Sequence, residues 1–520
     1  MRVALTLAWL SLASGAGAPN SRVVTTGELR DRIRGGWAGQ MIGVVYGAPV
    51  EHYWLGTWAL TDPPAWDGAK LVQALAQDDL YIDVLFLAVL DRKGPSAGTA
   101  DFGDALRNAR RPLAHGNLAA RRLLRRGVAA SDSGKPEFNP HWEDIDFQIG
   151  ADFIGLMAPG MPRVAQALAQ RVGPVIGGGE GLLGGVFIAC MYSAALVESN
   201  PEAVVHAGLA CLPASSRYYR TVAAVAASAK RNPHDWKRAW MELKQQAGET
   251  DRCPAGALRV FNIDAPFSGA LVALALLYGN GDFDHTLDVA VRAGYDADCT
   301  AASAGGVLGA ILGFKRIPKK WTAHFPEISQ QKFLHSEYTL DAAVESTLRQ
   351  AQENLRRAGV SVTGGKPMVL PKQEPATLPF LAGPADYPVE RISVADSRWR
   401  WSGHWETSFH VSKYTPVQTK TASHSGAEAS ITFFGTGAII SGPLLSGGGK
   451  ADVYLNGKFD RSLDVCSDEN RDRLGEAVWR RLGLPPGEHT VRLVVRGEPH
   501  PPCRDSRVAI DDLIVFTSGR

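Results

Sequence analysis

The apolar residues in the first two thirds of the chain recur at helical spacing. Leu29, Ile33, Trp37 and Met41 follow one another at intervals of four residues in the stretch that begins at Thr26, which is the spacing of one face of a helix. Similar patterns predict further helices at residues 80–90, 163–171, 186–196, 201–209, 215–229, 233–246, 269–277, 283–292, 301–312 and 340–357. No long stretch here alternates as a strand does, so this part is predicted to be mainly α-helical.

The pattern changes after residue 364. Proline and glycine become frequent up to residue 388, which predicts a linker with little structure of its own. Short β-type runs then follow, separated by glycine-rich turns and the Asn456-Gly457 turn. These runs lie at residues 429–434, 438–440, 451–455, 489–495 and 508–515. They predict a β-sandwich of the jelly-roll kind.

The length of 520 residues exceeds what one hydrophobic core usually holds. We expect four segments: a signal peptide at 1–20, an all-α catalytic domain at 21–360, a linker at 361–388 and a β-sandwich at 389–518. Met1-Arg2, the apolar residues 3–13 and the small residues 14–18 have the order of a secretory signal. The alternative is a frayed apolar N-terminus. The signal predicts a secreted or periplasmic protein.

Charge and cysteine content exclude some classes of function. The formal net charge is +2 without a long basic run, so nothing indicates a nucleic-acid partner, and no later apolar run is long enough for a membrane span. Cysteine and histidine spacing does not match a zinc site. Cys190, Cys211 and Cys299 lie in apolar or small-residue context and are expected to be reduced or merely buried. Cys466 and Cys503 could pair.

Glycines are concentrated at two places. Gly35, Gly36, Gly39 and Gly43 fall within the first helical pattern, where glycine is costly, so another backbone or a ligand is expected to approach closely there. Residues 177–185 match the spacing of a dinucleotide fingerprint, but the flanking chain lacks alternating strands and helices. We interpret them as a tight loop before a close-packed helix. Glu180 is then either a site acid or a first-turn charge favoured by the helix dipole.

Two pairs of acids stand directly ahead of apolar or small-residue helices. Asp78 and Asp79 precede the helix at 80–90, and Asp296 and Asp298 precede the helix at 301–312. Mg²⁺ and Ca²⁺ prefer carboxylate and hydroxyl oxygens. Together the pairs predict one divalent or dinuclear metal site. The alternative is that Asp78 and Asp296 are only helix caps, which helix starts favour regardless of chemistry.

The acid pairs, the glycine-rich first helix and the segment Gly-Tyr-Asp-Ala-Asp-Cys-Thr-Ala-Ala-Ser-Ala-Gly-Gly at 294–306 resemble the ADP-ribosylglycohydrolase family. The resemblance covers about residues 27–358. It implies an all-α orthogonal bundle that holds two Mg²⁺ ions and hydrolyses a bond at a ribose anomeric carbon. It also implies four metal ligands, which are Asp78, Asp79, Asp296 and Asp298.

The chain departs from the family pattern at several positions. Gln77 and Cys299 stand where members usually carry threonine, and a thiol is a poor Mg²⁺ ligand, so water or Thr300 is expected to take that position. Gly39-Gln40 replaces a Gly-Asp pair. The catalytic-type glutamate would fall near Gly47, where Glu51 is the nearest acid, and Gly150 stands where bacterial relatives often carry glutamate.

These features predict a metal-dependent glycoside hydrolase with a carbohydrate or ADP-ribosyl substrate. Glu51 and Glu180 are the candidates for proton transfer. The C-terminal β-sandwich resembles galactose-binding-like carbohydrate-binding modules, and export favours an extracellular glycan or glycoconjugate. Two other hypotheses remain at this point. One is a glycan-binding protein on an enzyme fold that has lost its acid, and the other is a helical structural domain whose acids only cap helices.

Overall fold

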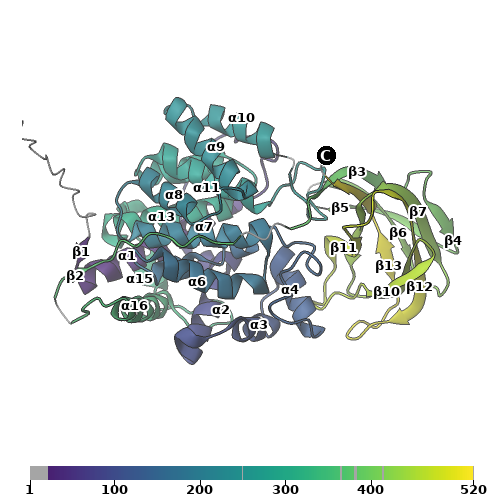
Figure 1. Cartoon of the computed structure of the whole chain (residues 1–520), viewed down its shortest axis with the longest axis horizontal. Coiled ribbons are helices and arrows are strands. Elements are labelled where there is room, and N and C mark those ends of the chain that lie inside the picture. The colour runs from purple at the N-terminus through teal and green to yellow at the C-terminus, as the bar shows by residue number, and fades with distance from the viewer. Residues whose placement is uncertain (1–21, 249, 364–365, 380–382, 413–414, 519–520) are drawn as a thin grey trace, which may run out of the picture.

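The computed structural model describes residues 22–248, 250–363, 366–379, 383–412 and 415–518. The signal peptide expected at residues 1–20 lies outside them. Figure 1 shows a helical body followed along the chain by a body of β-strands. Each has its own hydrophobic core. Within the described part, no helix is both long enough and apolar enough to cross a bilayer.

The helical body confirms the all-α prediction. Its α-helices are α1 (Thr26–Gly47), α2 (Asp78–Lys93), α3 (Thr99–Arg107), α4 (His115–Arg125), α5 (Asp152–Leu156), α6 (Pro162–Val172), α7 (Gly179–Ala195), α8 (Pro201–Ala210), α9 (Arg217–Arg231), α10 (Trp236–Ala247), α11 (Ala265–Gly279), α12 (Phe283–Arg292), α13 (Ala297–Leu312), α14 (Lys319–Thr322), α15 (Phe325–Ile328) and α16 (Leu340–Arg357). The bounds of α12 and α16 are those the sequence predicted. The short α3, α5, α14 and α15 were not predicted, because helices of one or two turns leave little periodic signal.

The second body is made of antiparallel sheets. Its strands are β3 (Asp386–Ser393), β4 (Arg400–Ser402), β5 (Glu406–Ser412), β6 (Thr415–Ala422), β7 (Glu428–Gly435), β8 (Gly437–Leu444), β9 (Gly449–Leu455), β10 (Lys458–Asp464), β11 (Arg473–Arg481), β12 (Gly487–Pro499), β13 (Val508–Ile510) and β14 (Asp512–Ser518). They form sheets of order β10-β9-β12-β7-β4, β11-β8-β14-β3 and β13-β6-β5. The first two sheets enclose the core, which confirms the β-sandwich.

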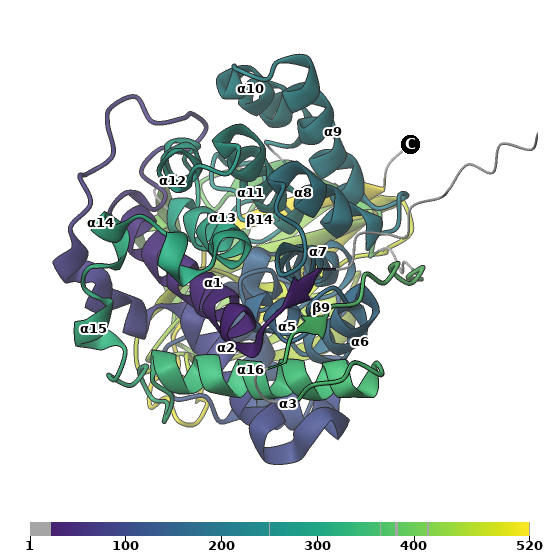
Figure 2. The ribbon, with the colours of Figure 1, turned by 90° about the vertical axis from the view of Figure 1, so that its left-hand side faces the viewer.

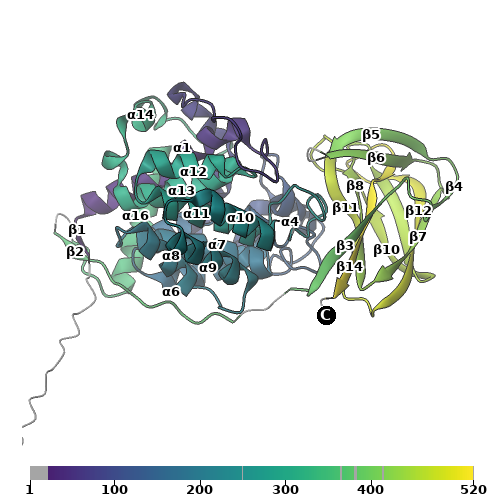
Figure 3. The ribbon, with the colours of Figure 1, turned by 90° about the horizontal axis from the view of Figure 1, so that it is seen from above.

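The chain between the two bodies runs along the helical body. Strand β2 (Met368–Val369) pairs with β1 (Val23–Val24) near the start of α1. Further on, the Gln373 amide donates to the Gly160 carbonyl oxygen at 3.0 Å. Backbone hydrogen bonds of this kind fix an otherwise aperiodic segment. Figures 1 and 3 show the segment passing from the end of α16 to β3, with α4 facing β11 across the domain boundary.

Helix α1 packs directly on α13 through its glycines. A Cβ added at Gly35, Gly39 or Gly43 would lie 2.0–2.1 Å from a backbone oxygen of α13, namely that of Gly309, Gly305 or Ala301. Figure 2 shows the two helices side by side at the centre of the helical body. The predicted close approach is therefore confirmed, and the neighbour is a backbone. Because the contact continues to Gly47 at the end of α1, which lies against Asp298, it fixes where α13 begins.

The cysteines required one correction. Cys190 in α7 and Cys211 after α8 are buried, as expected, but form a disulfide, so the alternative that they are reduced was wrong. Their apolar surroundings indicated burial but carried no information on pairing, since both helix faces meet only in the fold. Cys466 and Cys503 are joined in the β-sandwich, which confirms that pairing. Cys253 and Cys299 are free.

Candidate metal centre

The two acid pairs enter the site at helix starts without capping those helices. Asp78 and Asp79 occupy the first turn of α2, whose N-cap is Gln77, and Asp296 is the N-cap position of α13. Neither helix start has a side-chain capping hydrogen bond. A capping role therefore does not explain Asp78 or Asp296. Tyr295, directly before the late pair, has a φ of 58°, a conformation that costs energy for a residue with a bulky side chain.

The pairs converge in space. Asp79 and Cys299 are 220 residues apart in sequence, yet the Cys299 sulfur lies 3.7 Å from Asp79 Oδ2. Ligand atoms of Asp79, Asp298 and Cys299 lie within 4.8 Å of one another. Asp296 shares a second such group with Glu51 and His52. The structure thus brings all the acids predicted as metal ligands into one neighbourhood, together with Glu51.

Several carboxylate oxygens of this neighbourhood lack a protein partner. Asp79 Oδ1, Asp296 Oδ1 and Asp298 Oδ1 are buried and accept no hydrogen bond from the described residues. Burial first, and then the neighbouring carboxylates, raise the pKa of Asp79 and of Asp298 well above the ordinary value. Unpaired buried carboxylates are costly unless a proton or a cation compensates them. This oxygen-rich donor set fits a hard divalent cation.

The cluster is open to solvent on one side. The side chains of Asp78 and Glu51 are 39% and 46% exposed, whereas Asp79, Asp296 and Asp298 are buried beneath them. Glu51 Oε1 lies 3.2 Å from His52 Nδ1. A substrate can therefore reach Glu51 and Asp78 from outside, while the other carboxylates remain shielded from water.

A further layer of polar residues lies behind the cluster. Asp83, one turn beyond Asp79 on α2, accepts a 2.9 Å hydrogen bond from Gln40 of α1. Burial raises the pKa of neighbouring Asp152 to about 7. Gln40 thus supplies a neutral donor to the buried Asp83 carboxylate. The spacing of Asp79 and Asp83 could have revealed this layer.

Two other expectations about site residues have definite structural outcomes. Glu180 lies outside the cluster, and its two carboxylate oxygens accept the backbone N–H groups of Arg217 and Tyr218 at 2.7 and 2.8 Å. It therefore holds the start of α9. Gly150 packs against α2, where a Cβ would lie 2.6 Å from Ile82 Cγ2. A glutamate there would require the Ile82 side chain to shift.

Arg111 is a site residue that sequence reasoning missed. Its Nη2 lies 3.8 Å from Asp78 Oδ1, and its guanidinium carbon lies 6.0 Å from the centre of the Tyr81 ring. Arg111 belongs to a basic stretch without any motif, so nothing along the sequence distinguished it from the neighbouring arginines.

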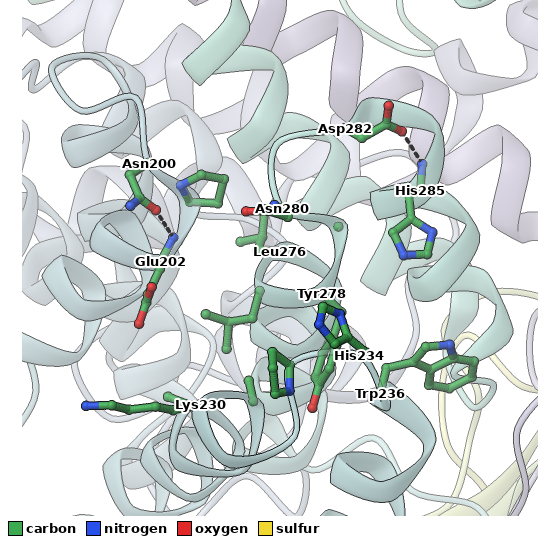
Figure 4. Close-up of a pocket in the computed structure, with 16 residues that line it drawn as sticks. Asn200, Glu202, Lys230, His234, Trp236, Leu276, Tyr278, Asn280, Asp282 and His285 are labelled. Carbon is green, nitrogen blue, oxygen red and sulfur yellow. Dashed lines mark hydrogen bonds between the residues drawn. The ribbon is translucent and has the colours of Figure 1, made fainter.

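A separate cavity of about 980 Å³ opens elsewhere in the helical body (Figure 4). It lies among the ends of α8 to α12. Two of its polar side chains cap helices: Asn200 accepts from the Glu202 amide, and Asp282 accepts from the His285 amide. None of the cluster acids lines it. The cavity is therefore explained by helix ends that meet at the surface.

Comparison with known proteins decides the family. The sequence model of the ADP-ribosylglycohydrolase family matches residues 25–356. The chain belongs to this family. Membership places it among the glycohydrolases, which are hydrolases by reaction class. All four predicted metal-ligand aspartates and Glu51 lie within the matched residues.

Other similarities are partial. An "A type blood alpha-D-galactosamine galactosaminidase" of Flavonifractor plautii is 31% identical over 105 residues, which cover 20% of this chain and 9% of that protein. This chain thus spans less than a tenth of that relative. A solved "ADP-ribosylglycohydrolase-related protein complex" aligns over 63% of this chain and 99% of its own, with 21% identity and a TM-score of 0.40. A carbohydrate-binding module in complex with calcium and xylotriose aligns over 25% of this chain, with 10% identity and a TM-score of 0.17.

Proposed function

We propose that this protein is a metal-dependent glycoside hydrolase that cleaves an N- or O-glycosidic bond at a sugar anomeric carbon. The observation that carries the proposal is the convergence of Asp79 and Asp298, from helices far apart in sequence, with partnerless buried oxygens on both. The proposed substrate is a glycan or glycoconjugate outside the cytoplasm, in keeping with the signal-like N-terminal sequence. The galactosaminidase similarity favours an amino sugar among the candidates.

The cations would be held by four aspartates, which are Asp78, Asp79, Asp296 and Asp298. Family membership leads us to expect two Mg²⁺ ions. Bound Mg²⁺ would supply Lewis-acid polarisation of sugar hydroxyls and of a water molecule. Cys299 offers sulfur where oxygen is preferred, so the chain supplies one hard ligand fewer than its relatives. The carboxylates of Asp79 and Asp298 must be deprotonated to bind metal.

Glu51 carries the acid–base role in this proposal. Its carboxylate is half exposed at the edge of the cluster, where it can exchange a proton with solvent and reach the anomeric carbon of a bound sugar. There it acts as a general base towards water or stabilises the positive charge that develops on the sugar. The adjacent His52 imidazole, at 3.2 Å, orients the carboxylate.

The β-sandwich is proposed to bind carbohydrate. Trp401 and Trp405 are partly buried against its core, and the Trp401 ring lies between those of Trp399 and Trp405, with centroids 5.2 and 4.9 Å apart. An aromatic surface of this kind can stack on a sugar face. Trp399 is buried and serves the core, so the proposed contact involves the outer two rings.

A second candidate function is glycan binding without hydrolysis. The contact of the Cys299 sulfur with Asp79 favours it, since a thiol occupies a position where the family has an oxygen ligand. This candidate predicts metal and glycan binding with no turnover of any glycoside.

The test combines metal binding with turnover. Purified protein, freed of metal by chelation, should gain thermal stability on adding Mg²⁺ or Mn²⁺, because a ligand that binds only the folded state must stabilise it. Asp79→Asn and Asp298→Asn should abolish this gain. Asp91→Asn is the matched control, since Asp91 lies at the far end of the same α2 and accepts hydrogen bonds from Tyr338 and Ser346. It should keep the metal-dependent gain.

Turnover then separates the substrate classes. ADP-ribosyl-arginine and aryl glycosides, including an N-acetylgalactosaminide, should be assayed with and without metal. Metal-dependent release of an aryl group supports the glycosidase proposal, and Glu51→Gln should reduce kcat by at least a hundredfold. No metal-dependent stabilisation at all would refute the metal centre, whereas metal and glycan binding without turnover would favour the second candidate.

A further inference from the structure

Arg111 lies on a segment that connects the metal centre to the β-sandwich. Residues 109–114 join α3 to α4, and they cross from the start of α2 to the domain boundary. On the α2 side, the Arg111 guanidinium lies beside Asp78 and Tyr81, and the Tyr81 hydroxyl oxygen accepts the Arg110 amide at 3.3 Å. Tyr81 and Asp78 share one face of α2, because they are three residues apart.

The β-sandwich holds the same segment from the other side. The Leu113 amide donates to Glu469 Oε1 at 2.8 Å, and the Leu113 carbonyl oxygen accepts from Arg473. Arg473 Nε also donates to Glu469 Oε2 at 2.7 Å. Both backbone groups of one residue in the helical body are therefore bound by side chains of the β-sandwich.

Arg121 of α4 connects Glu469 directly to the backbone of Arg111. Its Nη1 donates to the Arg111 carbonyl oxygen at 2.9 Å, and its Nη2 donates to Glu469. The side chains of Arg121 and Glu469 are only 2% and 5% exposed. Charge-assisted hydrogen bonds that water does not screen are strong and geometrically specific. Figures 1 and 3 both place α4, which carries Arg121, against the β-sandwich.

We propose that Arg111 is a positioning residue of the metal centre and that the β-sandwich, through Glu469, holds it against Asp78. This inference rests on the proposed function, because it assigns a role at the same site. The guanidinium supplies a positive charge among the carboxylates, restrains Asp78 and lowers the affinity of the site for a cation. The β-sandwich is then part of the active centre as well as a candidate glycan-binding module.

The first test measures binding of Mn²⁺ alone by titration calorimetry to the full-length chain. Removing a positive charge near the cation removes repulsion, so Arg111→Ala should bind Mn²⁺ at least threefold more tightly. Glu469→Gln keeps the shape of the side chain but loses one hydrogen-bond acceptor, which releases Arg111 from its place beside Asp78. The Mn²⁺ affinity of this variant should therefore rise by a similar factor. The double variant should shift no further than Arg111→Ala. A general loss of structure would weaken metal binding, so tightening separates positioning from damage.

The matched control is Asp464→Asn. Asp464 is the last residue of β10, close in sequence to Glu469, and forms an ion pair with Arg126, the residue directly after α4, but within the described part it makes none of the contacts to residues 109–114. Its Mn²⁺ affinity should equal that of the wild type. If Glu469→Gln fails to fold, Arg473→Gln removes the other half of the Leu113 contact and should give the same shift.

A second measurement tests, without metal, whether Glu469 holds residues 109–114. Hydrogen exchange of the Leu113 amide should be at least tenfold faster in Glu469→Gln and unchanged in Asp464→Asn. The proposal is overturned if Glu469→Gln leaves either the exchange rate of the Leu113 amide or the Mn²⁺ affinity at its wild-type value. It is also overturned if the changes in Mn²⁺ affinity of the two single variants multiply in the double variant. If the wild type binds no Mn²⁺, the proposed metal centre and the role of Arg111 there both fail, while exchange still decides whether Glu469 holds the segment.

Discussion

Gly47, the last residue of α1, lies against the residue that the metal centre needs at the start of α13. A Cβ at position 47 would lie 2.4 Å from Asp298 Cα and 2.5 Å from the Asp298 backbone nitrogen. Gly47 itself has φ −79° and ψ −32°, which alanine adopts without strain. The cost of Gly47→Ala is therefore steric. Restoring an ordinary carbon–carbon contact requires about 1 Å of separation between the two helices.

Overpacking of this kind costs about 1–3 kcal/mol of unfolding free energy. The displacement falls on Asp298, so the variant should also lose its metal-dependent stabilisation, which for the wild type is about 2.7 kcal/mol at a metal concentration of a hundred times Kd. Urea denaturation with and without Mg²⁺ measures both effects.

Gly27→Ala is the matched control on the same helix. Its added Cβ would meet only Thr25 Oγ1, at 3.8 Å, so it should leave metal binding unchanged and stabilise the protein by up to about 1 kcal/mol. The reasoning is refuted if Gly47→Ala is as stable as the wild type and responds to Mg²⁺ in the same way.

Three further predictions concern single sites. Cys299→Thr restores a hard ligand and should raise Mg²⁺ affinity several-fold by calorimetry; unchanged affinity would show that residue 299 does not ligate. Burial lowers the pKa of His141, but Asp144 and Glu476 outweigh it and raise the pKa to about 10 from 6.5. The stabilisation from His141 is therefore complete below pH 6.5 and disappears as the pH rises through about 10. The stability difference between wild type and His141→Gln should shrink over that window, and a constant difference would contradict the ion pair. Replacing Cys190 and Cys211 together by serine should cost about 3 kcal/mol in urea denaturation, since the bridge closes a short loop; a loss under about 1 kcal/mol would indicate that the bridge contributes little.

Local patterns were sufficient where the signal is local. The apolar spacing of residues 283–292 and 340–357 predicted α12 and α16 with their observed bounds. An amphipathic helix places apolar residues at a regular interval, and this interval is visible in the sequence. Strand β5 was not predicted, since it is an edge strand that is exposed along most of its length and so shows no alternation of apolar and polar residues.

The sequence by itself determined that two acid pairs stand at helix starts and that another backbone or a ligand must approach α1 closely. Both follow from residue chemistry: carboxylates at adjacent positions favour cations, and glycine in a helix is retained only for close contact. The tertiary structure alone decided that Glu51 belongs to the cluster and Glu180 does not, and that Arg111 lies beside Asp78. These placements depend on contacts between different helices and loops, from 33 residues apart for Arg111 and Asp78 to 356 for Leu113 and Glu469 of the β-sandwich, and no local pattern encodes such contacts.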